Sequence, residues 1–311
     1  MSDIERLFQQ ISPGMALAKM KLDNCPVGIY YGLSEEGNYR LAFLTENPPI
    51  IIDPTAHLKV SQWAECENVY WTAFELLTPS AKQVYFVLCD NLIKATLGCQ
   101  SEEIAMASVK NRFTTWKKLF KNPSSDMSEE LYKGLFGELY FLKKWMLEHY
   151  SSDVAVNAWS GPDRTAKDYS VGTDWYEVKT VSTNSETVKI SSLTQLDSVC
   201  AGKLILVKTE KMSKEYDNGE CSVAQLFSFI LDKVSDEAIK DSFVEKISQY
   251  GYNVENCDVN YSKYRVSSLN FYRVDESFPK ITPKEVPRNE IVRVQYELSI
   301  SAIEKYLEGE K

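Results

Sequence analysis

The chain has 311 residues, of which 44% are hydrophobic and 25% are charged, and its formal net charge is −9. A chain of this length and composition can bury one or two hydrophobic cores. The acidic balance argues against non-specific nucleic-acid binding through the global field, although it leaves room for a local basic groove. Only two histidines are present, which disfavours a histidine base or a histidine-rich metal site.

The seven cysteines are scattered and never form a C-x-x-C pair. This pattern is typical of buried thiols in a reducing compartment, and it supports neither a disulfide framework nor a zinc site. The N-terminus lacks an apolar signal segment, and no run of about 18 apolar residues occurs. We therefore expect a cytoplasmic protein with no membrane partner.

The first part of the chain predicts a small sheet followed by helices. Segments rich in β-branched and aromatic residues, separated by turn signals, predict strands at 28–34, 39–45, 49–53 and 67–75. A helix is expected to begin near Thr78 and to end before Gly98, and a second helix is expected at 101–120. The stretch KNPSSD at 121–126 is a break and a candidate domain boundary.

The central block has a different order of elements. A long helix at 127–149 is followed by a predicted strand at 153–159 and by a hairpin. A short helix is expected next, and then an apolar strand; these two elements are predicted at 190–200 and 203–209.

The C-terminal part predicts two more helices and two strands, at 222–234, 236–251, 265–274 and 290–300. We expect three regions: an N-terminal β-rich region with a helix (1–100), a core with a preceding basic helix (101–210), and a C-terminal α/β extension that packs on the core (211–311).

The hairpin KDYSVGTDWYEVKT (167–180) carries two carboxylates and an ammonium among residues suited to burial. Its Gly-Thr pair suits the centre of a tight turn, and that register sets Asp168 directly across from Glu177. Glu177 and Lys179 lie two apart on one strand, so their side chains share a face. A four-residue loop would give the same register, whereas a three-residue loop would send Asp168 to the opposite face.

Two carboxylates that face each other destabilise a hairpin unless a cation compensates them. Two hard oxygen ligands, with waters in the remaining positions, are how Mg²⁺ is usually held. We therefore expect Mg²⁺, or Mn²⁺, between Asp168 and Glu177. Lys179 would lie near the metal-bound water and a substrate phosphate, where it could orient or deprotonate the nucleophile and neutralise developing charge.

Glu138, on the long central helix, is a further acidic candidate. Helical spacing places it within an apolar stripe, where a carboxylate is costly unless it is paired or bound to a metal. Gly134 and Gly137 beside it would let another element approach closely. The alternative is a glutamate at the edge of the core that pairs with a lysine such as Lys133 or Lys179.

The central block resembles the PD-(D/E)XK nuclease core in its order of elements and in an aspartate followed by E-x-K. The motifs GLFGELYFL, WSGP, KDY, YEVKT and ISSLTQL resemble more narrowly a bacterial family of PD-(D/E)XK members associated with restriction and phage defence. The resemblance implies an α/β, restriction-endonuclease-like core, α-β-β-β-α-β, in which helices flank a mixed sheet. The N-terminal β-rich region and the C-terminal α/β extension would surround that core.

The same resemblance implies roles for five residues. Asp168 and Glu177 match the metal ligands, and Lys179 matches the catalytic lysine. Glu138 matches the acidic residue of the first core helix and is counted with the metal ligands, and Gln195 matches the polar residue of the second. For Gln195 the alternative is an ordinary glutamine on a helix surface.

One departure from the family pattern concerns the aspartate. The proline–aspartate pair of the family name falls at Pro162-Asp163, in the loop before the strand, rather than at the strand aspartate. Asp163 is therefore a competitor of Asp168 for the ligand role. Its alternative role is that of a turn residue after a proline.

The segment VKNRFTTWKKLFKN (109–122) reverses the overall charge, since it contains basic residues and no acid. Its cations alternate with aromatic residues and could follow a phosphate backbone. The alternative is an amphipathic helix with buried aromatics and solvated lysines. The candidate nucleic-acid contacts are Lys110, Arg112, Lys117 and Lys118.

These features predict a metal-dependent endonuclease that hydrolyses DNA phosphodiester bonds. The family resemblance implies a setting in bacterial restriction or phage defence, with partner proteins of a defence system and a possible homodimer. RNA as the substrate would use the same site and is equally compatible with the sequence. The alternative is a catalytically idle nuclease-like module that binds nucleic acid or a partner.

Overall fold

The computed structural model describes residues 3–12, 14–120, 127–163, 165–253, 261–286 and 290–311. The chain divides into two compact units. The first comprises Met1–Asp126 and Gly251–Val259, and the second comprises Met127–Tyr250 and Asn260–Lys311. The basic helix expected to precede the core therefore falls in the first unit, whereas the C-terminal extension, apart from 251–259, shares the second unit with the core.

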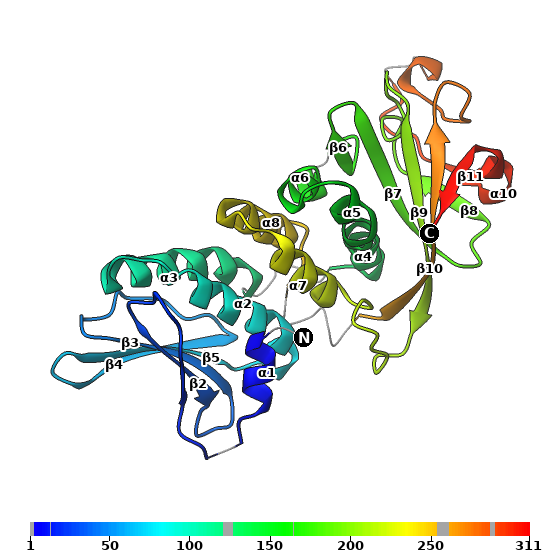
Figure 1. Ribbon diagram of the computed structural model, residues 1–311. Helices are drawn as coiled ribbons and strands as arrows, with labels where there is room; N and C mark the ends of the chain where they lie inside the picture. The colour runs from blue at the N-terminus through cyan, green and yellow to red at the C-terminus, as the bar shows by residue number, and fades with distance from the viewer. Residues whose placement is uncertain (1–2, 13, 121–126, 164, 254–260, 287–289) are drawn as a thin grey trace. The chain divides into compact units, whose positions relative to one another are not determined.

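The first unit contains an antiparallel sheet of five strands (Figure 1). Its order is β1-β2-β3-β5-β4. The strands are β1 (Ala18–Met20), β2 (Gly28–Leu33), β3 (Tyr39–Thr45), β4 (Leu58–Cys66) and β5 (Val69–Leu76). The strands expected around β2, β3 and β5 are confirmed, whereas β1 and β4 were not predicted.

Helices cover one face of this sheet (Figure 1). Tyr85 ties a helix to the two central strands, because its hydroxyl donates to the Phe74 carbonyl at 2.8 Å and accepts from the Leu41 N–H at 3.1 Å. The rings of Phe74 and Phe113 pack with their centroids 4.9 Å apart. The helical elements are α1 (Asp3–Gln9), η1 (Pro79–Ala81), α2 (Lys82–Lys94), α3 (Glu102–Trp116) and η2 (Lys117–Phe120).

The strand predicted at 49–53 is wrong, since this segment joins no sheet. Prolines flank its isoleucines, and a proline cannot donate to a strand ladder. The side chain of Gln62 takes the place of a partner strand: its amide donates to the Ile50 carbonyl at 2.8 Å and its oxygen accepts from the Ile52 N–H at 3.3 Å. The isoleucines of this segment are therefore held by a side chain instead of by a partner strand.

The second unit is built on a mixed sheet of order β12-β10-β9-β7-β6. Strands β7 and β9 pair in parallel, and the other neighbours are antiparallel. A separate antiparallel pair is formed by β8 and β11. The strands are β6 (Tyr169–Val171), β7 (Asp174–Ser182), β8 (Thr187–Ile190), β9 (Gly202–Met212), β10 (Lys263–Val274), β11 (Tyr296–Ser299) and β12 (Leu307–Glu310).

A long helical segment lies against this sheet. It begins as α4 (Glu129–Phe141), widens into the π-helical turn η3 (Leu142–Met146), and ends in α5 (Leu147–His149). The Ser128 hydroxyl caps α4 by accepting from the Leu131 N–H at 3.2 Å. The other helical elements are α6 (Ser152–Asn157), η4 (Gly161–Asp163), α7 (Val223–Lys233), α8 (Glu237–Gln249), η5 (Pro283–Glu285), α10 (Ile300–Ile303) and η6 (Glu304–Tyr306).

Both faces of the β7–β9 region are covered. Phe141, from α4, packs on Tyr176 and Phe271, with ring centroids 5.3 and 6.3 Å apart. On the other face Val181 and Leu204 join a hydrophobic cluster with side chains from β8, β11 and α10. Alternation along β7 therefore sends even-numbered residues toward α4 and odd-numbered residues toward the small β8–β11 sheet.

Two predicted elements of the central block are wrong. Residues 153–159 were expected as a strand, but α6 occupies 152–157, and Ala155 and Val156 bury their side chains as parts of a helical turn. Residues 190–200 were expected as a helix, but Ile190 ends β8 and turns follow. The unit is an α/β structure with mixed and antiparallel sheets flanked by helices, compatible with a nuclease-like core, but the predicted α-β-β-β-α-β order is not confirmed.

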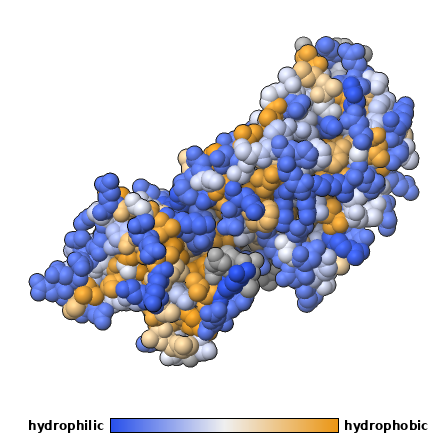
Figure 2. Space-filling model, in the orientation of Figure 1, coloured by the Kyte–Doolittle hydropathy of each residue, from blue (hydrophilic) through white to orange (hydrophobic). Residues whose placement is uncertain are grey.

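Apolar side chains are gathered mainly inside the two units. On the face drawn in Figure 2, hydrophilic residues cover much of the surface and hydrophobic ones are interspersed among them. Within the described part of the chain, no helix has the length and apolar character needed to cross a membrane.

At Gly137, α4 packs closely against β7. A Cβ at Gly137 would lie 1.8 Å from Thr180 Oγ1 and 3.0 Å from Thr180 Cβ, whereas a Cβ at Gly134 would meet only the Tyr250 hydroxyl at 3.8 Å. We expect Gly137→Ala to lower the free energy of unfolding by about 1–3 kcal/mol through overpacking. Gly134→Ala, on the same helix, should raise it by up to about 1 kcal/mol. Urea unfolding of both variants checks this, and equal effects would contradict the close packing.

Candidate active site

The hairpin of β6 and β7 has the register expected from the sequence. Val171 pairs with Asp174, Ser170 pairs with Trp175, and Tyr169 pairs with Tyr176. Gly172 begins the two-residue turn with a φ of 60°, in the region that glycine tolerates best. Asp168, one residue before β6, is therefore positioned across from Glu177.

The centre of the candidate site consists of Asp168, Glu177 and Lys179. Asp168 Oδ2 accepts a 2.7 Å hydrogen bond from the Val178 N–H, which holds the carboxylate against β7. Lys179 Nζ donates to Glu177 Oε1 at 2.7 Å. The Glu177 side chain is 1% exposed and that of Lys179 is 19% exposed, so this ion pair is almost withdrawn from water.

Glu138 reaches the same region from α4 and is also buried. Its Oε2 accepts from the Trp159 indole N–H and its Oε1 accepts from the Tyr250 hydroxyl, both at 2.7 Å. The Trp159 and Tyr250 rings stack with centroids 6.3 Å apart, and the Tyr169 hydroxyl donates to the Glu138 carbonyl at 2.9 Å. The buried glutamate thus has neutral donors, and the lysine partners considered from the sequence are not its hydrogen-bond partners here.

The carboxyl groups at the site influence one another strongly. Burial, followed by the charge of Asp168, raises the pKa of Glu177 to about 8 and that of Glu138 to about 8. Burial also raises the pKa of Asp168, although Lys179 opposes this. Burial acts to lower the pKa of Lys179, but Glu177 and Asp168 outweigh it and raise that pKa. Lys179 and the nearby Lys167 therefore do not offset the burial of three carboxyl groups, and the site has room for additional positive charge.

The donor set suits a hard divalent cation held by two protein ligands. Among the described residues, no group of three or more His, Cys, Asp and Glu side chains is arranged to hold a metal. Both oxygens of Glu138 accept hydrogen bonds, so Asp168 and Glu177 are the carboxylates best placed to hold an ion. Carboxylate oxygens with waters are the usual environment of Mg²⁺, and a cation would offset the charge repulsion that raises these pKa values.

Gln195 lies near the hairpin but has a local role. Its side-chain oxygen accepts from the Ser191 N–H at 2.8 Å within the loop that follows β8. Its main-chain oxygen accepts from Lys167 Nζ at 2.6 Å. The helix expected to present Gln195 is absent, so the support it would give to a water or to Lys179 stays a prediction.

Lys167 is a residue that the sequence did not single out. Its ammonium donates to the main-chain oxygens of Thr194, Gln195 and Asp197 at 2.9, 2.6 and 2.9 Å, and lies 4.1 Å from the centre of the Trp175 ring. Burial lowers the pKa of Lys167 to about 8, although Glu177 and Asp197 oppose this. In this loop the three carbonyls are satisfied by a lysine instead of by main-chain N–H groups. The sequence could have pointed to Lys167 only through its position next to Asp168 in the hairpin.

Asp163 occupies a different environment from Asp168. It lies in η4, its side chain is half exposed, and its Oδ2 is 3.9 Å from Lys246 Nζ. Lys246 Nζ also donates to the Trp159 carbonyl. Asp163 is thus tied to α8, which is consistent with the turn-residue alternative.

The basic residues predicted to contact nucleic acid belong to the first unit. Arg112 is buried, so its guanidinium is not presented to solvent, contrary to expectation. Lys117 donates to the Asp53 carbonyl at 3.4 Å and lies 3.8 Å from its carboxylate. Lys110 is half-buried and Lys118 is exposed. The amphipathic alternative therefore describes this helix well, and its contact with nucleic acid stays a prediction.

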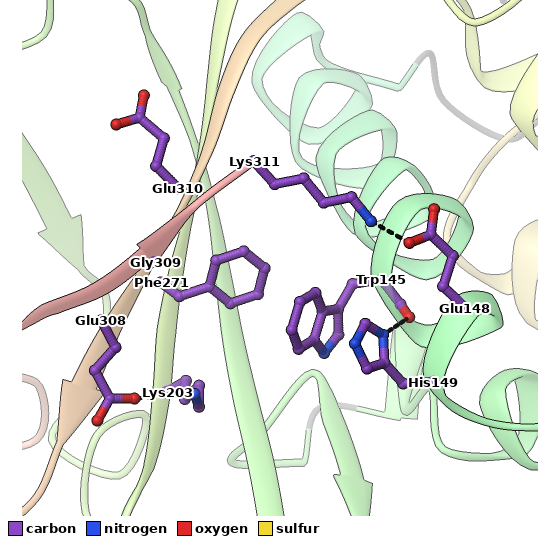
Figure 3. A pocket seen from close by; sticks show the side chains of 9 residues that line it. All are labelled: Trp145, Glu148, His149, Lys203, Phe271, Glu308, Gly309, Glu310 and Lys311. Atoms are coloured by element: carbon purple, nitrogen blue, oxygen red, sulfur yellow. Dashed lines mark hydrogen bonds and ion pairs between the residues drawn. The ribbon is translucent and has the colours of Figure 1, made fainter.

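A cavity of about 420 Å³ lies in the second unit beyond the end of α4 (Figure 3). None of the predicted site residues lines it. Its lining residues are Trp145, Glu148, His149, Lys203, Phe271, Glu308, Gly309, Glu310 and Lys311.

Comparison with known families identifies the family of this chain. A family model described as "Putative PD-(D/E)XK family member, (DUF4420)" matches residues 6–301. The chain belongs to this family. The resemblance inferred from the sequence is thereby confirmed, and membership of a PD-(D/E)XK family points to a nuclease-type hydrolase. Searches of curated proteins and of solved structures each found no match.

The charge imbalance of this PD-(D/E)XK site should make the free energy of unfolding depend on pH. The pKa of Glu177 rises from 4.5 to about 8 on folding, so its protonation stabilises the fold below pH 4.5 and this contribution is lost as pH rises through about 8. Without divalent cations, we expect the free energy of unfolding to fall between pH 5 and 8.5, and Glu177→Gln to remove about 1–3 kcal/mol of that fall. Exposed Glu186→Gln is the control. Equal pH profiles for Glu177→Gln and the unsubstituted protein would contradict this.

Lys167 should stabilise the loop after β8. Lys167→Met keeps the length of the side chain but leaves three main-chain oxygens without their donor, so we expect a loss of about 2–3 kcal/mol in the free energy of unfolding. Lys189→Met, at an exposed position of β8, should change it by less than about 0.5 kcal/mol. Urea unfolding measures both, and a Lys167→Met effect as small as that of the control would show that the ammonium is dispensable.

Proposed function

We propose that this chain is a metal-dependent endonuclease that hydrolyses DNA phosphodiester bonds. The observation that carries the proposal is the buried excess of carboxylate beside Lys179, at the positions of the family's D…E-x-K signature. Clustered buried carboxylates destabilise a fold, and a bound cation would compensate their charge. The setting in bacterial restriction or phage defence is part of the same proposal and rests on the family resemblance.

Asp168 and Glu177 would hold Mg²⁺ or Mn²⁺ in this proposal. When bound, such an ion lowers the pKa of a coordinated water and neutralises charge on a phosphate. Asp168 is already fixed by the Val178 N–H, whereas Glu177 is paired with Lys179. Release of Glu177 from that pair would free the Lys179 ammonium to donate to a phosphate oxygen or to a nucleophilic water.

Glu138 would act through its proton and its charge. Because Trp159 and Tyr250 satisfy both of its oxygens, Glu138 can stay in place whether it is ionised or protonated. With a pKa near 8, it can exchange a proton close to neutral pH. A direct bond from Glu138 to the metal would require one of these hydrogen bonds to be given up.

An idle nuclease-like module is the second candidate function. Two observations favour it: no three-ligand group is present among the described residues, and Lys179 occupies an oxygen of Glu177. Such a module would bind nucleic acid or a partner without cleaving it. Metal binding and cleavage distinguish the two candidates.

The activity test uses plasmid, linear and single-stranded DNA, and RNA, with Mg²⁺ or Mn²⁺. We expect Asp168→Asn and Lys179→Met each to lower the cleavage rate at least about 100-fold, because each removes a group that stabilises the transition state. Asp163→Asn and the exposed Lys211→Met should leave the rate within about twofold. Thermal unfolding of each variant shows whether it is folded.

Three outcomes would overturn parts of the proposal. Loss of activity in Asp163→Asn but not in Asp168→Asn would move the ligand role to Asp163. Cleavage that survives both Asp168→Asn and Lys179→Met would show that the catalytic residues are assigned wrongly. No cleavage together with no calorimetric Mg²⁺ or Mn²⁺ binding would favour the idle module, whereas RNA as the only substrate would correct the choice of DNA.

A further inference from the structure

The strand β4 lies at the edge of the sheet in the first unit (Figure 1). It has nine residues, Leu58–Cys66, and it pairs with β5 on one side only. In the described part of the chain, every other strand at a sheet edge has three or four residues. Short edge strands are one way in which proteins avoid pairing with another chain. The length of β4 therefore makes it the edge best suited to the addition of a strand.

Two hydrogen bonds show which main-chain groups of β4 face outward. The His57 carbonyl accepts from the Leu77 N–H at 2.9 Å, in continuation of the pair with β5. The Leu58 carbonyl accepts from the Thr55 N–H at 2.9 Å, on the opposite side of the strand. These directions alternate along an antiparallel strand, so the N–H and C=O groups of even-numbered residues point away from β5. The residues concerned are Val60, Gln62 and Ala64.

Residues 49–53 contact β4 without using these groups. They bond to the side chain of Gln62, whose amide also donates to the Thr72 hydroxyl at 3.1 Å. Thr72 shares a face of β5 with Phe74, and Phe74 packs on Phe113 of α3. The contact therefore lies on the helix side of the sheet and uses no main-chain group of β4.

Trp63, on the other face of β4, has one side of its ring directed beyond the edge. Its ring stacks on that of Trp71 with centroids 5.9 Å apart and planes 12° apart. Trp71 lies on β5, so the stacked side of the Trp63 ring is the side toward β5. No aromatic ring of the described residues covers the opposite side, and Trp63 is 39% exposed. The edge thus offers an apolar surface as well as main-chain groups.

A second copy of β4 fits this edge in one antiparallel register about a two-fold axis at Gln62. Each Gln62 would exchange two main-chain hydrogen bonds with Gln62 of the second copy. Val60 would likewise exchange them with Ala64 of the second copy, and Ala64 with Val60, so every pair uses groups that face outward. A C2 interface brings the same surface of both copies together, which this register does.

The side chains on the open face are complementary in the same register. Glu65 lies on this face, because it accepts a 2.7 Å hydrogen bond from the indole of Trp71. Exposed Lys59 shares the face by alternation and would lie across from Glu65 of the second copy, twice by symmetry. The two Trp63 rings would be diagonal neighbours, a separation that aromatic side chains can bridge. Opposite charges and apolar rings therefore favour a second copy over an unrelated partner.

We propose that this chain forms a two-fold dimer in which β4 pairs with β4 of a second copy from Lys59 to Glu65. The pairing joins the sheets of the two first units into one continuous sheet. It buries the outward side of Trp63 and gives hydrogen-bond partners to the main-chain groups of the edge. The dimer forms without nucleic acid or metal, so it holds whether or not the chain is a nuclease.

Sedimentation velocity of the full chain, without nucleic acid or divalent cations, measures the dimer. We expect a concentration-dependent equilibrium between monomer and dimer, with a dissociation constant below about 100 µM. A chain that stays monomeric up to about 200 µM would overturn the proposal.

Charge reversal tests the register. Lys59→Glu and Glu65→Lys each place like charges across the axis, so each should raise the dissociation constant at least about tenfold. The double variant restores opposite charges and should lie within about threefold of the unsubstituted chain. Lys19→Glu makes the same charge change on β1, at the other edge of the sheet, and should leave the constant within about twofold. A double variant as weak as the single ones would contradict the register.

Ala64→Pro tests the main-chain hydrogen bonds. Proline removes an N–H that faces outward and leaves the bonds to β5 in place, so the dissociation constant should rise at least about tenfold. Thermal unfolding at a concentration where the chain is monomeric shows whether each variant is folded. A dimer that is equally stable in folded Ala64→Pro would place the interface elsewhere and overturn the proposal.

Discussion

Three buried carboxyl groups close to the Lys179 ammonium are the constraint on which the second unit depends. Each acid is held in a different way: Asp168 by a main-chain N–H, Glu177 by Lys179, and Glu138 by a tryptophan and a tyrosine. These contacts come from the hairpin, from α4, from the segment after α6 and from the end of α8. The packing of the unit therefore serves to keep together charges that would otherwise separate.

Glu138 and Glu177 have different roles at the site, because neutral groups donate to Glu138 and a charged group donates to Glu177. A carboxyl group held by neutral donors can gain or lose a proton without a large rearrangement, whereas a carboxylate paired with an ammonium is stable only while a positive charge stays beside it. The second arrangement makes Glu177 the member that responds to a competing cation. The mixture suits chemistry in which charge moves while the scaffold stays fixed.

Local patterns in the sequence were enough to predict the hairpin. A glycine turn and strand alternation fix which side chains of β6 and β7 face each other, and the apolar stripe of α4 places Glu138 on its buried side. Long-range contacts were not predictable in this way. Tyr250 is 112 residues from the Glu138 that it bonds, and Lys167 is 27 to 30 residues from the carbonyls that it bonds. Val154 and Val156 favoured a strand by propensity, yet tertiary packing placed α6 there.

The division of the chain into units has a topological consequence. The chain leaves the first unit after Asp126, returns to it at Gly251, and leaves it again after Val259. Tyr250, which holds Glu138, is the last residue before that return. The two units are joined by three covalent crossings, so neither can be excised as one uninterrupted piece of chain. A genetic exchange that replaced only one end of the chain would therefore always separate residues of at least one unit from the rest of that unit.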